Sequence, residues 1–304
     1  MKLTVGTRGS TLALKQVKII EDLIAEKMLD LKIETKVIVT SGDKFRDRSI
    51  EAINEKGVFT NALDEAVFNG EISFAVHSMK DLPMGISPEL EIVSIPERAS
   101  PNDAFISENY SNISALPEKA IVGTASPRRK AQVLYQRKDL DVKLIRGNVE
   151  TRLRKLRDGE YDAIILAKSG LDRLNMENTI TDLLNLEDFT PMACQGALAL
   201  VARSDNQEVI HYLGKITHSN SWNCTMAERA FMSTVGGGCK TPIGVIVKQE
   251  KELELFSSII APNGSLRFQY KQKGCSETPE DFGKTAALDM LDQGGAAFIS
   301  RWKE

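Results

Sequence analysis

The sequence predicts an α/β protein: two similar lobes with mixed, mostly parallel sheets, followed by a small C-terminal α+β domain. Two repeated patterns predict the lobes. A helix, an Asn-Gly-Glu or Asp-Gly-Glu turn and an apolar strand occupy residues 63–78 and again 153–168. Val-Gly-Thr ends a short strand before a polar turn and a helix at residues 5–7 and 122–124. Strands that alternate with helices favour parallel pairing, and such folds bind ligands where strands end and helices begin.

The elements of the first lobe follow from local patterns. Residues 2–6 predict a short apolar strand, and the apolar side chains of 12–24 recur near the helical period. A second strand is expected over 33–40. Residues 42–60 are charged and lack periodicity, which predicts a long functional loop. The apolar segment 72–76 predicts a further strand.

Turn signals divide the rest of the chain. Residues 96–103 have the composition of a linker, and residues 186–191 are expected to form a return crossing. Beyond residue 219, a helix over 223–235 is followed by strands, an Asn263-Gly264 hairpin turn and a helix over 286–291. The expected domains are residues 1–98 with 191–216, residues 99–190, and residues 217–304.

The composition excludes several classes of protein. The chain is 42% hydrophobic and 27% charged with a formal net charge of −3, which is typical of a folded protein and not of a disordered one. Arg8 interrupts the first apolar stretch too early for a signal peptide, and no later run reaches the roughly 18 apolar residues of a membrane span. We therefore expect a cytoplasmic protein that has no membrane partner and whose four cysteines are free thiols.

The charges are distributed unevenly. Residues 128–157 hold eleven Lys or Arg and three Asp or Glu, a net of +8, which leaves −11 for the rest of the chain. This asymmetry predicts a local anion site in an otherwise acidic protein. Tyr135 is the one aromatic residue of the basic stretch, so binding of nucleic acid by base stacking is not expected.

Arginines gather at the predicted strand-to-helix turns. Ser126 and Asn148 are residue types of a helix N-cap, and Pro127 is typical of a first helical position. Free backbone N–H groups and neighbouring guanidiniums at these turns can bind a carboxylate or phosphate. Arginine favours bidentate recognition of planar carboxylates. The arginines at or near these turns are Arg8, Arg128, Arg129, Arg146 and Arg152. Arg154 and Arg157 are expected to form a solvated helix face.

Two other positions carry reactive groups, each with two interpretations. Asp81, beside Lys80, can act as an acid, a base or a counter-ion for a developing cation, or it can form the turn before the following proline. Cys239 follows three glycines and precedes a lysine, which exposes the thiol and favours the thiolate, although a buried inert cysteine fits as well. His77 alone is expected to be structural. The three histidines lack metal spacing, so no metal site is expected.

Five segments, in order along the whole chain, make the sequence resemble the porphobilinogen deaminase (hydroxymethylbilane synthase) family. They are Val-Gly-Thr-Arg-Gly-Ser (5–10), Ala-Val-His-Ser-Met-Lys-Asp-Leu-Pro (75–83), Val-Gly-Thr-Ala-Ser-Pro-Arg-Arg (122–129), Arg-Gly-Asn-Val-Glu-Thr-Arg (146–152) and Gly-Gly-Gly-Cys-Lys-Thr-Pro-Ile-Gly (236–244). The resemblance implies two lobes like those of periplasmic binding proteins. It also implies a transferase of haem biosynthesis that deaminates four porphobilinogen molecules and joins them head to tail into the linear tetrapyrrole hydroxymethylbilane, releasing ammonia.

The resemblance further implies a cofactor and residue roles. A dipyrromethane, built from two substrate molecules, is expected to be joined to Cys239 through a thioether. Asp81 is similar to the family's catalytic aspartate, which protonates the departing amine and stabilises a cationic azafulvene. Contacts with the cofactor are implied for Lys80, Ser126, Arg128, Arg129, Arg146, Asp43, Lys56, Ser78 and Thr124. Contacts with the substrate are implied for Arg8, Ser10, Arg146, Arg152, Arg173, Gln195 and Phe59.

The family also implies a monomer and a mobile lid over residues 43–59. Cys194 stands where the family has a glycine, which leaves the packing of the crossing segment open. Two rival hypotheses compete with the enzyme. A non-catalytic two-lobe receptor for anionic solutes predicts an export signal and needs no cysteine in a glycine loop. A nucleic-acid-binding regulator predicts steeply salt-dependent DNA binding.

Overall fold

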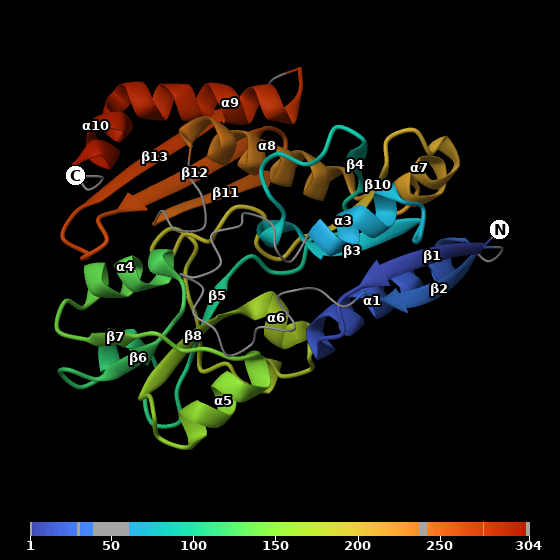
Figure 1. Ribbon diagram of the computed structural model, residues 1–304. Helices are drawn as coiled ribbons and strands as arrows, with labels where there is room; N and C mark the ends of the chain where they lie inside the picture. The colour runs from blue at the N-terminus through green and yellow to red at the C-terminus, as the bar shows by residue number, and fades with distance from the viewer. Residues whose placement is uncertain (1, 29–30, 39–60, 237–241, 276, 302–304) are drawn as a thin grey trace. The chain divides into compact units, whose positions relative to one another are not determined.

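The computed structural model of the chain describes residues 2–28, 31–38, 61–236, 242–275 and 277–301 (Figure 1). The chain forms two compact units, residues 1–98 with 197–222 and residues 99–196 with 223–304. The finer division into three domains stays a prediction.

The first unit is built on a five-stranded sheet of order β2-β1-β3-β10-β4. Its strands are β1 (Lys2–Thr7), β2 (Lys32–Val37), β3 (Phe74–Ser78), β4 (Leu90–Ser94) and β10 (Leu198–Arg203). Its helices among the described residues are α1 (Thr11–Lys27), α3 (Asn61–Phe68), α7 (Gln207–Gly214) and the start of α8 (Ser219–Val235), with a 3-10 turn at Met79–Asp81. β1 pairs in parallel with β2 and β3, whereas β10 is antiparallel to β3 and β4.

The second unit contains a five-stranded sheet of order β7-β6-β8-β5-β9. Its strands are β5 (Asp103–Ile106), β6 (Ile121–Gly123), β7 (Asp141–Lys143), β8 (Ala163–Ala167) and β9 (Asp182–Leu183), and the accompanying helices are α4 (Pro127–Gln136), α5 (Val149–Arg157) and α6 (Lys168–Arg173). β6 is parallel to β7 and β8, and β5 is antiparallel to β8 and β9. In both sheets, therefore, four strands share one direction and one strand is reversed, which confirms the predicted mixed, mostly parallel α/β class.

The repeated sequence patterns occupy equivalent places in the two sheets. The paired residues are Val5↔Phe74 and Gly6↔Ala75 in the first sheet, and Val122↔Ala163 and Gly123↔Ile164 in the second. A Cβ atom on Gly6 would lie 2.2 Å from Cδ1 of Ile72, and one on Gly123 would lie 2.8 Å from Cδ1 of Tyr161. At both Val-Gly-Thr segments a neighbouring side chain occupies the space of a Cβ, so any larger residue there would displace that side chain.

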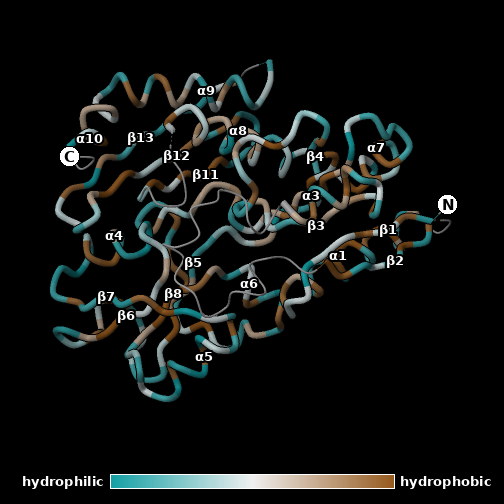
Figure 2. The backbone as a smooth tube through the Cα atoms, viewed as in Figure 1, coloured by the Kyte–Doolittle hydropathy of each residue, from teal (hydrophilic) through white to brown (hydrophobic). Residues whose placement is uncertain are grey.

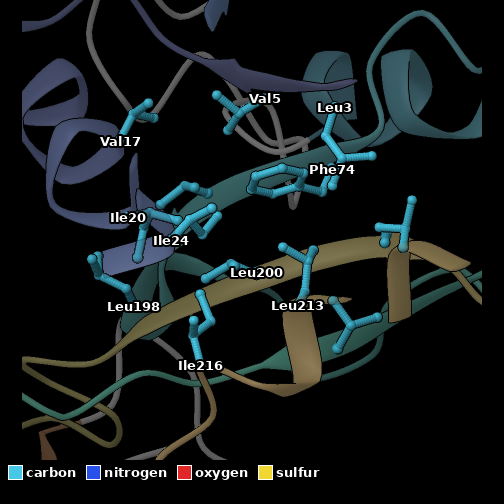
Figure 3. Packing of buried hydrophobic residues seen from close by; sticks show 14 of the residues in the cluster. Leu3, Val5, Val17, Ile20, Ile24, Phe74, Leu198, Leu200, Leu213 and Ile216 are labelled. Atoms are coloured by element: carbon cyan, nitrogen blue, oxygen red, sulfur yellow. The ribbon is translucent and has the colours of Figure 1, made fainter. Parts of the chain in front are cut away.

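The core of the first unit lies between α1 and one face of its sheet (Figure 3). Val17, Ile20 and Ile24 are three or four positions apart, so they share one face of α1 and pack in the same cluster as Phe74 and Leu200. Each such side chain contributes about 1.5–3 kcal/mol when it is fully buried. The opposite face of the sheet packs against α3, so helices cover both faces.

The C-terminal part of the second unit is a three-stranded antiparallel sheet, β11 (Ile243–Gln249), β12 (Leu253–Ile260) and β13 (Arg267–Gly274). Helix α9 (Pro279–Met290) lies along this sheet and leads through a π turn at Leu291–Gly295 into α10 (Ala296–Ser300) (Figure 1). Figure 2 shows hydrophobic segments along β11 and alternating colours along α9. The predicted hairpin turn is confirmed, because Gly264 has a φ of +70° and donates its N–H to the carbonyl of Ala261 at 2.7 Å.

Several predicted boundaries were wrong. The strand predicted at 72–76 is β3 at Phe74–Ser78, because its pairing with β10 continues to Ser78. The strand predicted at 33–40 ends at Val37. The final helix, which was expected to hold residues 286–291, is present as α9; it begins at Pro279, where the Thr278 side chain caps it by accepting the N–H of Asp281. The predicted loop over 42–60 lies outside the described residues.

The segment before β10 contains two residues in the left-handed backbone region. Cys194 has a φ of +61° and Gly196 a φ of +93°. The first value explains why glycine suits the position of Cys194, since a side chain is strained there by about 1–2 kcal/mol. Cys194 is nevertheless accommodated: it is buried, its N–H donates to Oε2 of Glu228 at 2.6 Å, and its Sγ donates to the carbonyl of Thr225 at 3.4 Å.

Gly196→Ala tests how tightly this segment packs. A Cβ on Gly196 would lie 2.3 Å from the carbonyl oxygen of Ala99. Gly159, with a φ of +78°, has open space around its Cβ position, so Gly159→Ala isolates the backbone strain. Urea unfolding should show a loss of about 1 kcal/mol for Gly159→Ala and about 1–3 kcal/mol more for Gly196→Ala. Equal losses of unfolding free energy for Gly159→Ala and Gly196→Ala would show that the backbone around Gly196 shifts to accommodate the added methyl group.

Candidate carboxylate-binding site

A pocket in the first unit lies where β1 and β3 end and α1 begins. Its polar lining consists of Arg8, Ser10, Gln16, His77, Ser78 and Asp81. β1 and β3 are parallel neighbours, so their carboxyl ends meet at one edge of the sheet, as in other α/β ligand sites. The pocket therefore brings together four of the residues predicted in this unit, Arg8, Ser10, Ser78 and Asp81, from the ends of two separate strands, whereas Lys80 is not part of its lining.

Local hydrogen bonds fix this edge. Ser10 caps α1, because its Oγ accepts the N–H of Ala13 at 3.3 Å. Gln16, buried on α1, donates its Nε2 to Oγ of Ser78 at the end of β3, at 2.7 Å. The helix N-terminus and the strand end are thereby held together, and the partial positive charge of the helix terminus faces the region of Arg8 and Ser10.

Asp81 ends the 3-10 turn that follows β3. The turn is anchored by buried Met79, whose N–H donates to the carbonyl of Ala197 at 3.0 Å. The Asp81 side chain is exposed, and among the described residues its carboxylate accepts no hydrogen bond. A turn-forming aspartate would bond to the backbone of its own turn. This carboxylate instead lines the pocket and is available to a ligand.

In the second unit, both predicted helix caps are present. Oγ of Ser126 accepts the N–H of Arg129 at 3.4 Å, and Pro127 is the first residue of α4. The N–H of Ser126 in turn donates to Oγ1 of buried Thr124 at 3.2 Å. At the second turn, Oδ1 of Asn148 accepts the N–H of Thr151 at 2.9 Å and starts α5. These two helix starts confirm the turn chemistry predicted from the sequence.

Arg128 and Arg129 are buried against a carboxylate that the sequence analysis missed. Asp103, fully buried at the start of β5, receives Nε and Nη2 of Arg129 on Oδ1 at 3.0 and 2.7 Å. Its Oδ2 lies 2.8 Å from Nη1 of Arg128. Burial by itself raises the pKa of Asp103, but the two guanidiniums outweigh burial and hold that pKa well below its usual range. The signal available in the sequence was Asp103 itself, a charged residue at the start of the otherwise apolar strand β5.

The two arginines differ in how many donors the protein uses. Arg129 also donates Nη1 to the carbonyl of Ile165 at 3.1 Å and Nη2 to Oε1 of Gln195 at 3.4 Å. Arg128 uses Nη1, whereas its Nε is buried with no hydrogen-bond partner among the described residues. Gln195, predicted to contact substrate, is buried and donates its Nε2 to Oδ1 of Asp103 at 2.9 Å.

The other predicted arginines of this unit have no acidic side chain within salt-bridge distance among the described residues. Arg152 donates its Nε to the carbonyl of Gly147 at 2.8 Å, and burial together with the charge of Arg129 lowers its pKa. Arg173 donates Nη2 to the carbonyl of Gly196 at 2.6 Å, and burial lowers its pKa to about 10. Arg146 is exposed. Desolvated guanidiniums without a carboxylate partner favour a bound anion.

Four of the predicted site residues, Asp43, Lys56, Phe59 and Cys239, lie outside the described residues. Lys80 is half-buried in the same 3-10 turn as Asp81. Among the described residues, no helix is long and apolar enough to cross a membrane. Cys194, Cys224 and Cys275 are free thiols, as predicted for these three.

These features define an α/β protein with a polar pocket at the edge of its first sheet and a group of arginines in its second unit. Residues 3–211 match the family domain described as "Porphobilinogen deaminase, dipyromethane cofactor binding domain", and residues 222–292 match "Porphobilinogen deaminase, C-terminal domain". Relatives named porphobilinogen deaminase come from Syntrophomonas wolfei, 39% identical over 98% of this chain and 97% of its own length, and from Staphylococcus aureus strain MSSA476, 38% identical over 100% and 99%.

The chain belongs to the porphobilinogen deaminase family. It is a porphobilinogen deaminase enzyme of tetrapyrrole biosynthesis, with a dipyrromethane cofactor-binding domain. Among solved structures, it is similar to a putative methionine-binding lipoprotein from Bacillus subtilis, with a TM-score of 0.43 and 11% identity over 71% of this chain and 90% of that chain. The methionine-binding protein MetQ gives a TM-score of 0.44 and 11% identity over 77% and 94%.

Asp103→Asn tests the buried ion cluster. The substitution keeps the side-chain volume but leaves two buried guanidiniums without their counter-ion, so the free energy of unfolding at pH 7 should fall by about 3–5 kcal/mol. The guanidiniums depress the folded-state pKa of Asp103 below the unfolded value of about 3.9. The stabilisation is therefore present above that pH and is lost as the pH falls towards the folded-state pKa.

Urea unfolding between pH 3 and pH 8 checks both statements. The difference between wild type and Asp103→Asn should stay constant from neutral pH down to about pH 5 and shrink below about pH 4. Asp158→Asn, at an exposed carboxylate 3.7 Å from Arg154, is the control and should cost less than about 1 kcal/mol. A difference that does not depend on pH would contradict the assigned ionisation of Asp103.

Proposed function

We propose that the described arginines bind the acetate and propionate groups of porphobilinogen and of the pyrroles derived from it, and that Asp81 is the catalytic residue. The proposed product is the linear tetrapyrrole hydroxymethylbilane, built from four porphobilinogen molecules joined head to tail with release of ammonia. The observation that carries the proposal is the buried Nε of Arg128, which has no hydrogen-bond partner among the described residues, together with the desolvated guanidiniums of Arg152 and Arg173, which have no acidic side chain within salt-bridge distance there.

Binding of carboxylates follows from the donors that the protein leaves available. In the second unit, Arg146, Arg152 and Arg173 are proposed to hold substrate carboxylates, because each lacks an acidic side chain within salt-bridge distance among the described residues. In the first unit, Arg8 and Ser10 line the pocket beside the N-terminus of α1 and are proposed to hold another. Planar guanidinium groups match carboxylates through two parallel N–H···O bonds.

The residues also fit the cofactor. A dipyrromethane carries several carboxylates, and the orphaned, buried Nε of Arg128 is a donor that such a carboxylate would satisfy. When bound, the cofactor supplies a terminal pyrrole as the nucleophile. Arg128, Arg129, Arg146, Ser126 and Thr124 are proposed to hold its carboxylates. Ser78, Lys80, Asp43 and Lys56 are proposed to assist them, and Cys239 to attach it through a thioether.

Asp81 is proposed to act on the leaving group of the substrate. Its carboxyl group lines the pocket and has no hydrogen bond to the described residues, so it can donate a proton to the departing amine and then face the positive charge that develops on the pyrrole. A carboxylate that is already aimed at a developing cation stabilises the transition state without reorganisation. Phe59 and Gln195 are proposed to assist substrate binding, although Gln195 donates to Asp103.

The proposed setting is that of a cytoplasmic monomer with porphobilinogen as its small-molecule partner and with no nucleic-acid partner. A net charge of −3 and a basic stretch with a single aromatic residue support the absence of nucleic acid. The arginines of that basic stretch include the buried Arg128 and Arg129, which Asp103 holds inside the second unit and not on its surface.

Intact mass tests the attachment to Cys239. The protein purified from cells that make porphobilinogen should exceed its sequence mass by one dipyrromethane, and Cys239→Ser should have the unmodified mass. Cys275→Ser removes an exposed free thiol and should keep the added mass. A modified Cys239→Ser protein would place the attachment on another residue.

Asp81→Asn tests the catalytic assignment. The substitution keeps the volume and removes the acid, so kcat should fall by about 10²–10⁴-fold while KM changes little. Steady-state turnover of porphobilinogen is the measurement. Asp22→Asn, at an exposed carboxylate of α1 in the same unit, should leave both constants unchanged. Normal turnover by Asp81→Asn would remove Asp81 from its proposed role.

A further inference from the structure

One end of the Arg128 guanidinium is held by three groups of the second unit. Nη1 of Arg128 lies 2.8 Å from Oδ2 of Asp103, 2.8 Å from Oε1 of Gln132 and 2.7 Å from the carbonyl oxygen of Thr190. Arg128 is 5% exposed and the other three residues are at most 1% exposed. The cluster is therefore dry, and each polar contact in it is stronger than it would be in water.

Gln132 forms hydrogen bonds with two members of this cluster. Its Oε1 accepts from Arg128, and its Nε2 donates to the same Thr190 carbonyl at 2.8 Å. The amide has one possible orientation, because a guanidinium only donates and a carbonyl only accepts. Gln132 is four residues after Arg128 on α4, so the two side chains lie on the same face of the helix. The Gln132 amide thus fixes both the guanidinium and the carbonyl that supports it.

Thr190 is a rigid support for this arrangement. A Cβ atom on Gly244 of β11 would lie 2.5 Å from the Thr190 carbonyl oxygen and 2.7 Å from its Cβ, so the strand backbone lies directly against this residue. The next residue along β11, Val245, donates its N–H to the carbonyl of Pro191 at 2.9 Å. Because the backbone on both sides of the contact is fixed, the carbonyl cannot follow a displaced Arg128 side chain.

The crowding at Nη1 determines which edge of Arg128 remains for a ligand. Three acceptors surround Nη1, which has two hydrogens, whereas Nε is buried and has no acceptor among the described residues. The edge formed by Nε and Nη2 is one of the two edges through which a guanidinium can donate two parallel hydrogen bonds to a carboxylate. A buried donor without an acceptor is unfavourable, and a bound carboxylate would remove that cost.

We propose that Gln132 is a positioning residue for the reaction: it holds Nη1 of Arg128 against Thr190 so that the Nε–Nη2 edge is presented to a carboxylate of the pyrroles that become the cofactor. The inference rests on the proposed role of Arg128. Gln132 does not touch the ligand and acts through the guanidinium alone.

Cofactor attachment to the apo-protein tests the proposal. Full-length protein without cofactor is incubated with increasing porphobilinogen, and the fraction that gains the dipyrromethane mass is followed by intact mass spectrometry. Gln132→Met has a side chain of similar length without the amide, and should need about tenfold more porphobilinogen for half-maximal attachment. Gln136→Met, one turn further along α4 at an exposed position, is the matched control and should behave like wild type.

A double-mutant cycle separates positioning from a general loss of structure. If Gln132 acts through Arg128, Gln132→Met should have less than about a twofold effect when Arg128 is already replaced in Arg128→Lys. An equal effect in both backgrounds, or attachment by Gln132→Met within twofold of wild type, would overturn the proposal. Normal attachment by Arg128→Lys alone would instead overturn the proposed role of Arg128.

A second variant protects the test against misfolding. If Gln132→Met is not recovered with the urea-unfolding midpoint of a folded protein, Gln132→Asn replaces it in the same cycle. The Asn amide is one methylene shorter and cannot reach both Arg128 and Thr190, so it should also raise the porphobilinogen requirement in the wild-type background and not in Arg128→Lys. Unchanged attachment by Gln132→Asn would count against the proposal in the same way.

Discussion

The buried carboxylate of Asp103 is the constraint on which the arginine-rich edge of the second unit depends. Two adjacent guanidiniums on one helix turn repel each other and lose their hydration when they are buried. Asp103 offsets both effects because its two oxygens meet Arg129 and Arg128 separately. Gln195 then donates to the same carboxylate, so the segment before β10 is tied to this ion cluster.

As a consequence, the neighbouring Arg128 and Arg129 have different roles. Arg129 donates from Nε, Nη1 and Nη2 to groups of the protein, so it links α4, β5 and β8 and has fewer donors left for the cofactor carboxylate that it is proposed to help hold. Arg128 is held at one nitrogen and keeps donors for a carboxylate. The charge of a residue therefore does not identify a ligand-binding arginine. The number of donors that the fold leaves unused is the better indicator, and it follows from acceptors distant in the sequence.

Each sheet ends in a polar edge, but the two edges have different chemistry. The edge of the first unit combines the capped start of α1 with an exposed carboxylate, Asp81, that no described residue engages. The edge of the second unit combines two capped helices with guanidiniums. Val5-Gly6 and Val122-Gly123 have equivalent strand pairings, so the backbone has the same arrangement at both edges. The side chains placed after the strands then give the first edge an exposed carboxylate in the same pocket as Arg8, and the second edge a group of arginines.

Much of this architecture could be predicted from the sequence, because it depends on local patterns. The helix caps at Ser126 and Asn148, the Asn263-Gly264 hairpin and the α/β repeat all follow from residue types at short spacings. The motifs also identified the family. Strand ends were predicted less well, since β3 extends to Ser78 only because β10, more than a hundred residues later, pairs with it.

The sequence by itself determined the turn chemistry, the repeated α/β plan and the residue types of the site, because these depend on contacts within a few positions. Tertiary structure alone decided which donors and carboxylates are left for a ligand. Gln132 lies one turn from Arg128 on α4, but Asp103 and Thr190 reach Arg128 from two distant segments, and no local pattern encodes their meeting. The burial of each guanidinium is also decided by tertiary structure, because residues far along the chain displace the water around it.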